Sequence, residues 1–136
     1  MAVGFSDTDY KQDIPVNLGI RGRPVMRSVL IDSGARDGGI AGGASATELL
    51  PGTVLAPITA SSRFSDFDND ASDGTEAEGD SVILMEKVTD ISTGHQRALI
   101  ASGGGSFNWD KLRWRLSGDK SAYARADAPF AFYNAV

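Results

Sequence analysis

The sequence predicts a small, mainly β domain, and two observations support this prediction. Apolar runs of strand length recur in the second half of the chain, most clearly at residues 82–85 and 97–101. Turn-forming residues separate these runs by only a few positions, and such short spacing is typical of strands joined by tight turns. A length of 136 residues is enough for one domain with a stable core, so we expect a single domain.

The first 46 residues predict an extended arm and a connector that precede a β-rich domain at residues 47–136. Between residues 14 and 31, aliphatic side chains are interspersed with two prolines and two glycines, which disfavours a central strand and suits an extended arm or an edge strand. Residues 32–46 hold five glycines among small residues, a composition typical of a flexible connector. The alternative is a tail without function, but the apolar content of residues 25–31 favours an arm that binds a partner.

The predicted domain opens with a turn at Pro51-Gly52 and a strand over residues 53–59. The next strand is expected within residues 81–90, where four consecutive apolar residues indicate burial on both faces. A turn at residues 92–94 leads to a short strand at residues 97–101, and three consecutive glycines at 103–105 allow a sharp reversal of the chain.

The C-terminal third is expected to supply much of the core or of an interface, because it holds seven of the eleven aromatic residues. Residues 117–119 predict the cap of a short helix over residues 120–125, which Pro129 would stop. The chain ends on an apolar tail, which predicts that this tail is tied into a sheet.

Charge is unevenly distributed along the chain. Eight acids and no Lys or Arg lie between Phe64 and Glu86, whereas the rest of the chain holds ten acids and thirteen bases. A net charge of −5 without a basic patch disfavours nucleic-acid binding, in which Lys and Arg contacts to phosphates supply most of the affinity. No run of 18 apolar residues predicts a membrane span, and the N-terminus does not resemble a secretory signal.

Motifs that carry chemistry are not found in the sequence. Asp66, Asp68 and Asp70 match the first ligands of an EF-hand loop, but Ala71 and Ala77 replace its essential glycine and bidentate glutamate. A looser oxygen-ligand site stays open as an alternative to a solvated turn. The chain has no cysteine, a single histidine (His95), and neither a nucleophile elbow nor a phosphate loop. We therefore predict no catalytic residue, no metal and no cofactor, and hence not an enzyme.

A glycine turn leads into an aromatic-x-aromatic-acid pattern followed by a hydrophobic residue and a tryptophan: Phe107, Trp109, Asp110, Leu112 and Trp114. This pattern resembles the C-terminal half of the small head decoration proteins of lambda-like tailed bacteriophages. The order of upstream motifs is also similar to that family: Pro57-Ile58, Ser61-Ser62-Arg63, Phe67-Asp68 and Asp73-Gly74. The resemblance, which includes the apolar C-terminal tail, covers residues 47–136.

The resemblance implies a β-tulip type of fold that forms a homotrimer at the three-fold positions of the expanded phage head. There the protein would bind the major capsid protein and act as cement on the outer surface of the virion. The residues that would form the core or the trimer interface are aromatic or aliphatic: Phe107, Trp109, Leu112, Trp114, Phe130 and Phe132. The longer N-terminal region and the larger acidic loop depart from the family pattern.

In this interpretation the segment from Ile14 to Ile31 is the capsid-binding arm, because its prolines and glycines suit an extended chain and its arginines suit an acidic groove. The expected contact residues are aliphatic or basic: Ile14, Val16, Ile20, Arg21, Arg23, Val25, Arg27, Val29 and Ile31. The alternative function is a carbohydrate- or receptor-binding β module on a virion or cell surface, in which Trp109 or Trp114 would be exposed as a stacking platform.

Overall fold

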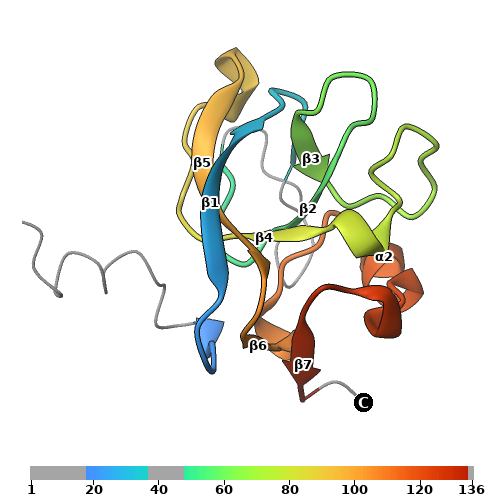
Figure 1. Ribbon diagram of the computed structural model, residues 1–136. Helices are drawn as coiled ribbons and strands as arrows, with labels where there is room; N and C mark the ends of the chain where they lie inside the picture. The colour runs from blue at the N-terminus through green and yellow to red at the C-terminus, as the bar shows by residue number, and fades with distance from the viewer. Residues whose placement is uncertain (1–17, 37–47, 135–136) are drawn as a thin grey trace, which may run out of the picture.

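The computed structural model describes residues 18–36 and 48–134, and it confirms the predicted mainly β class (Figure 1). Five strands close a barrel in the order β1-β3-β2-β4-β5. Their bounds are β1 (Val25–Ile31), β2 (Val54–Pro57), β3 (Phe64–Asp66), β4 (Val82–Leu84) and β5 (Gln96–Gly103). The last two strands, β6 (Ser106–Asn108) and β7 (Ala131–Tyr133), form a separate two-stranded parallel sheet.

The longest pairing in the barrel joins β1 to β5, which run antiparallel and side by side in Figure 1. It extends from Val25 opposite Gly103 to Ile31 opposite Gln96. On its other side, β1 pairs with β3 in parallel at one position only, where Ile31 lies opposite Phe64. The barrel is therefore closed at the C-terminal end of β1, and the other residues of this strand have no partner on that edge among the described residues.

The prediction of an arm is wrong for residues 25–31, the C-terminal part of the segment from Ile14 to Ile31. Residues 25–31 are a barrel strand, and Val29 and Ile31 are 5% and 0% exposed because alternate side chains of β1 point into the barrel. Pro24 and Gly22 precede β1 and so do not interrupt it. The predicted boundary at residue 47 is wrong for the same reason, since the described body begins at Leu18, which is also buried.

The other predicted arm residues divide into two groups. Ile20 is half-buried against the core, whereas Arg21, Arg23, Val25 and Arg27 are exposed. Ile14 and Val16 lie outside the described residues. A deletion of residues 1–31, which an arm would tolerate, would remove β1 from the barrel.

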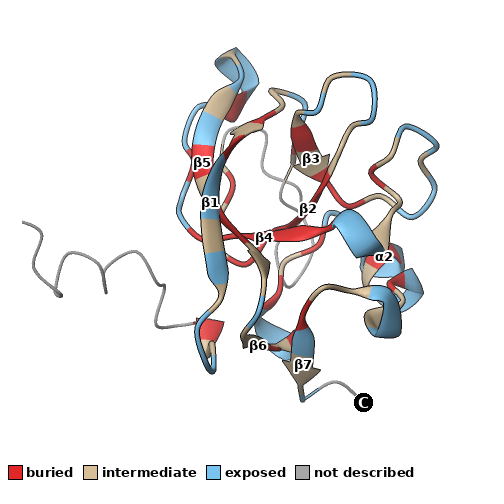
Figure 2. Ribbon diagram, viewed as in Figure 1, coloured by how far each residue is buried: buried red, intermediate tan, exposed pale blue. Residues whose placement is uncertain are grey.

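The core has two parts that share the strands of the barrel. The first fills the barrel and includes Val29, Ile31, Leu55, Phe64, Leu84 and Ile100. The second lies between the outer face of these strands and the C-terminal third, and it holds Phe67, Ile83, Phe107, Trp109, Trp114 and Tyr123. Because Ile83 faces one part and Leu84 the other, β4 is buried on both faces, as the continuous apolar run predicted (Figure 2).

Short helices connect the strands. They are η2 (Glu78–Asp80), η3 (Ile91–Thr93), η4 (Trp109–Lys111), α2 (Ser117–Ala122) and η5 (Arg125–Asp127). The predicted helix begins three residues earlier than expected, because Ser117 and Asp119 lie in its first turn instead of capping it, and it ends at Ala122. No helix in the described part of the chain is long and apolar enough to cross a bilayer.

The C-terminal tail is tied into a sheet, as predicted, through the pairing of β7 with β6. The glycine turn before β6 needs a left-handed backbone, with φ values of +68° at Gly104 and +69° at Gly105. The hydroxyl of Tyr133 donates a hydrogen bond to the carbonyl oxygen of Gly19, and the guanidinium of Arg21 lies 3.7 Å from the centre of the Tyr133 ring. Both ends of the described body therefore lie together.

Candidate functional site

The six residues predicted for the core or the trimer interface lie in or against one core cluster. Phe107 and Leu112 are 0% and 1% exposed, and Trp109, Trp114 and Phe130 are also buried. Phe132 is half-buried and packs against them. Their position shows a core role in the single chain.

The aromatic rings of this cluster pack mainly edge to face. Tyr123 is central, with ring centres 5.0 Å from Phe67, 5.2 Å from Trp114 and 6.1 Å from Phe132. Trp109 lies 5.3 Å from Trp114 and 5.2 Å from Phe132. Such pairs stabilise beyond the area they bury, so the C-terminal layer is held firmly on the barrel.

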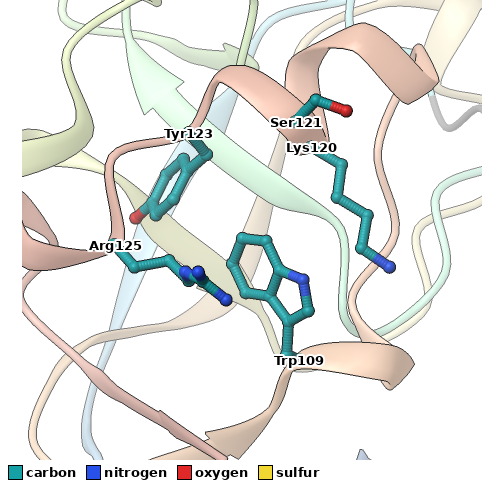
Figure 3. Close-up of a pocket in the computed structure, with 5 residues that line it drawn as sticks. All are labelled: Trp109, Lys120, Ser121, Tyr123 and Arg125. Carbon is teal, nitrogen blue, oxygen red and sulfur yellow. The ribbon is translucent and has the colours of Figure 1, made fainter. Parts of the chain in front are cut away.

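A hollow of about 260 Å³ opens where Trp109 reaches the edge of this aromatic layer (Figure 3). Two short helices supply part of its lining. Trp109 is the first residue of η4, directly after β6, and Lys120 and Ser121 belong to α2. Tyr123 is the C-cap of α2 and Arg125 is the first residue of η5, and both line the same hollow. Only 8% of Trp109 is exposed, so most of the indole is packed in the aromatic layer.

Two cations converge on this indole. The Nζ atom of Lys120 lies 5.8 Å from the centre of the Trp109 ring, and the Cζ atom of Arg125 lies 5.0 Å from it. Both distances are within reach of a cation–π contact. Among the described residues, neither cation forms an ion pair with a carboxylate. The hollow is therefore a positively charged point on a chain whose net charge is −5.

A second hollow, of about 330 Å³, lies on the other side of Arg125. It is lined by Arg125 and Ala126 together with Phe130, Ala131 and Phe132, so it runs along the beginning of β7. Arg125 separates the two hollows and faces both. We call the two together the Arg125 groove.

A third hollow, of about 220 Å³, lies at the end of the barrel where β1 and β3 separate. Phe64, Val82 and Ser102 line it, and Arg27 lies across it with its Cζ atom 5.6 Å from the centre of the Phe64 ring. Asp80 is on the same rim, so positive and negative side chains both border this hollow. It lacks the excess of charge that marks the Arg125 groove.

Buried carboxylates of the acidic interval have structural partners. Asp66 is 3% exposed, where its carboxylate lies 3.3 Å from Arg115 Nη1 and accepts a hydrogen bond from the backbone N–H of Arg36. Asp66 belongs to β3, so the solvated turn that the sequence suggested for Asp66, Asp68 and Asp70 does not include it. Asp70, by contrast, is exposed.

Asp119 is the least satisfied of the buried acids. Its Oδ1 accepts a hydrogen bond of 3.0 Å from the backbone N–H of Asn69, while its Oδ2 is buried without a partner. Burial raises the pKa of this carboxyl, and the negative charges of Asp68 and Asp66 raise it further. The site is an acidic cluster, but no three acidic or histidine side chains in the described ranges are arranged to hold a metal ion.

His95 takes part in a surface cluster. Its Nδ1 accepts a hydrogen bond of 3.0 Å from the backbone N–H of Ser33 and lies 3.7 Å from an oxygen of Asp32. Burial pushes the pKa of Asp32 up, but the hydrogen bond from Arg63 and the N–H of Gly34 outweigh burial and hold it below its ordinary value. These contacts join the end of β1 to the turn before β3, which is a structural role.

Comparison of the chain with protein-family models, with curated proteins and with solved structures gave no match. The functions that the sequence suggested are therefore compared by the geometry of the surface.

The sequence reasoning missed Lys120 and Arg125. These two residues lie five positions apart on either side of Tyr123, and they converge only because α2 ends at Ala122 and the chain turns through Tyr123 into η5. A signal was present, since both are bases within the aromatic-rich third and the chain elsewhere has an acidic excess. The sequence does not show that both would point toward Trp109.

Proposed function

We propose that this chain is a head decoration protein of a lambda-like phage. It would bind the outer surface of the expanded head as a homotrimer and stabilise the head through contacts with the major capsid protein. The observation that carries the proposal is the pattern of Phe107, Trp109, Asp110, Leu112 and Trp114, which resembles that family. In this chain the pattern forms β6 and η4 and anchors the C-terminal layer to the barrel.

Burial of the candidate residues disfavours the alternative function, a carbohydrate- or receptor-binding module. A carbohydrate-binding module needs an exposed aromatic face, and its candidates were Trp109 and Trp114. They are 8% and 5% exposed, because both rings are packed in the aromatic layer. A sugar ring could therefore not stack on either face.

A cement protein needs a way to hold a neighbouring chain, and the open edge of β1 offers one. Over the residues before Ile31 this strand has β5 on one side only among the described elements. At its start, Val25 is 60% exposed. An extended segment of a neighbour could add to this edge and gain main-chain hydrogen bonds. A trimer would use a heterologous interface that closes after three copies.

Head binding tests the proposal directly. The full chain is mixed with expanded empty heads assembled from the major capsid protein of the same genome, and sedimented beside unexpanded heads. We expect saturable binding to expanded heads alone, and density for three copies around each three-fold axis by electron cryo-microscopy. If the chain stays in the supernatant with expanded heads, or binds as isolated monomers away from the three-fold axes, the proposal is wrong.

A chain that lacks residues 1–17 tests the part of the predicted arm that lies outside the described residues. Truncation there leaves Leu18 and β1 in place. We expect head binding to weaken while the circular dichroism spectrum is retained. Full affinity of the truncated chain would place the anchor in the body, for example at the β1 edge.

A further inference from the structure

The Arg125 groove combines three features that no part of the proposed function uses. One hollow holds two cations beside the Trp109 ring, and the next hollow brings Phe130 and Phe132 next to Arg125. The third feature is the edge of β7 beside them. In the two-stranded sheet β7 pairs with β6 alone, so its other edge has no partner strand among the described elements.

We propose that the Arg125 groove binds an extended acidic peptide segment of a partner protein. The segment would lie along β7, place an apolar side chain against Phe130 and Phe132, and place a carboxylate between Arg125 and Lys120. An open strand edge supplies main-chain hydrogen bonds to such a segment, and adjacent hollows select its side chains. The inference does not depend on the proposed function, because it rests on this surface alone.

Charge is the reason to choose an acidic segment. Lys120 and Arg125 form no ion pair within the described part of the chain, and the planar guanidinium of Arg125 can donate two parallel hydrogen bonds to a carboxylate. Both side chains are half-buried on aromatic surface, which limits the solvation that they would lose on binding.

A nucleic acid fits the same groove poorly. The neighbouring η2 carries Glu78 and Asp80 and contacts η5, which itself carries Asp127, so negative charges flank the two cations. The carboxylate of Glu78 is held at this place by a hydrogen bond of 3.2 Å from the backbone N–H of Ala124. A single carboxylate on a peptide can avoid these acids, whereas a run of phosphates would be repelled by them. The buried indole of Trp109 also offers no face on which a base could stack.

Selection from a library of random decapeptides displayed on a carrier tests the proposal without knowledge of the partner. The full chain is immobilised, and bound peptides are sequenced after elution. We expect enrichment of sequences in which Asp or Glu lies within two residues of a valine, isoleucine, leucine or phenylalanine. The most enriched peptide is then synthesised, and its Kd is measured by quenching of tryptophan fluorescence.

The substitutions Arg125→Gln and Lys120→Gln should each raise the Kd of this peptide by tenfold or more. When the parent chain is titrated with the peptide, the amide resonances of residues 131–133 should shift. Arg97→Gln is the matched control, because Arg97 is exposed on β5 at a distance from the groove and loses the same charge. The proposal is overturned if the enriched peptides lack acids, if both groove variants bind as tightly as the parent, or if a ten-nucleotide thymidine oligomer binds and displaces the peptide.

Discussion

The hydroxyl oxygens of Tyr123 and Ser81 lie 2.5 Å apart in the core, and the Ser81 hydroxyl also donates to the carbonyl oxygen of Glu78 at 2.7 Å. A serine hydroxyl carries one hydrogen, so Tyr123 must be the donor in the first contact. This chain of two bonds links the C-terminal aromatic layer to the start of β4.

Replacing Tyr123 with phenylalanine removes this donor and leaves the ring in place. We expect the free energy of unfolding to fall by about 0.5–1.5 kcal/mol, because the Ser81 oxygen loses a buried partner. Urea denaturation followed by circular dichroism measures the change. A loss above about 3 kcal/mol would mean that the ring itself had moved.

The same tyrosine should make stability fall in alkali. Burial raises the pKa of Tyr123 to about 12, which is above its ordinary value of 10.0. The folded state therefore favours the neutral phenol, and its contribution is complete below pH 10 and is lost as pH rises through 12. In that window the free energy of unfolding should fall by up to about 1.4 kcal/mol per pH unit. Comparison with Tyr123→Phe, which lacks the group, isolates the effect.

Asp119→Asn should stabilise the fold near neutral pH. The asparagine side chain keeps an oxygen for the N–H of Asn69 and removes a buried charge whose second oxygen has no partner. We expect a gain of about 1 kcal/mol, because a neutral amide costs less to bury than a carboxylate and is not repelled by Asp68 and Asp66. Because the pKa of Asp119 is raised, its favourable contribution is present below the ordinary Asp value of 3.8 and is lost as pH rises through the folded value. The gain of the variant should therefore vanish in acid, and thermal melts at pH 7 and pH 3.5 would check this.

Two acids of the acidic interval should respond differently to neutralisation. Asp66→Asn removes the charge of a buried carboxylate that pairs with the exposed Arg115, and it should cost about 1–3 kcal/mol. Asp70→Asn changes an exposed side chain and should stay within about 0.5 kcal/mol of the parent. Equal effects of the two substitutions on the denaturation midpoint would contradict the burial of Asp66.

Glycine-to-alanine substitutions at two positions should have opposite signs. Gly74 has a φ of +111°, and a Cβ there would collide with the Thr59 hydroxyl and lie 2.7 Å from the carbonyl oxygen of Pro57. We expect Gly74→Ala to cost about 2–4 kcal/mol. Gly118 lies in α2 with nothing within 4 Å of an added Cβ, so Gly118→Ala should gain about 0.5–1 kcal/mol. Differential scanning calorimetry of both variants beside the parent measures the two shifts.

Local patterns predicted those elements whose signal lies within a few residues. The turn at Pro51-Gly52, the buried run of β4, the strand at β5 and the tied tail were all confirmed. For β1 the sequence left an arm and an edge strand open, and the arm was preferred. Glycines and prolines precede this strand in the same window, and β5, the strand that covers one edge of it, is distant in the sequence. The meeting of Lys120, Arg125 and Trp109 was missed for a similar reason, since it depends on how α2 is folded back on η4.

The hydrogen bond between Tyr133 and Gly19 has a consequence for chain connectivity. Because the two ends of the described body meet, a linker of a few residues between positions 18 and 134 would make the chain circular. New termini could then be opened at Gly94, which lies beyond the opposite end of the β1–β5 pair, about 20 Å away at ~3.3 Å per residue. An added Cβ at Gly94 meets nothing within 4 Å, so the turn there has room for a cut. Such a permuted chain would display fused cargo from the end of the barrel that faces away from positions 18 and 134.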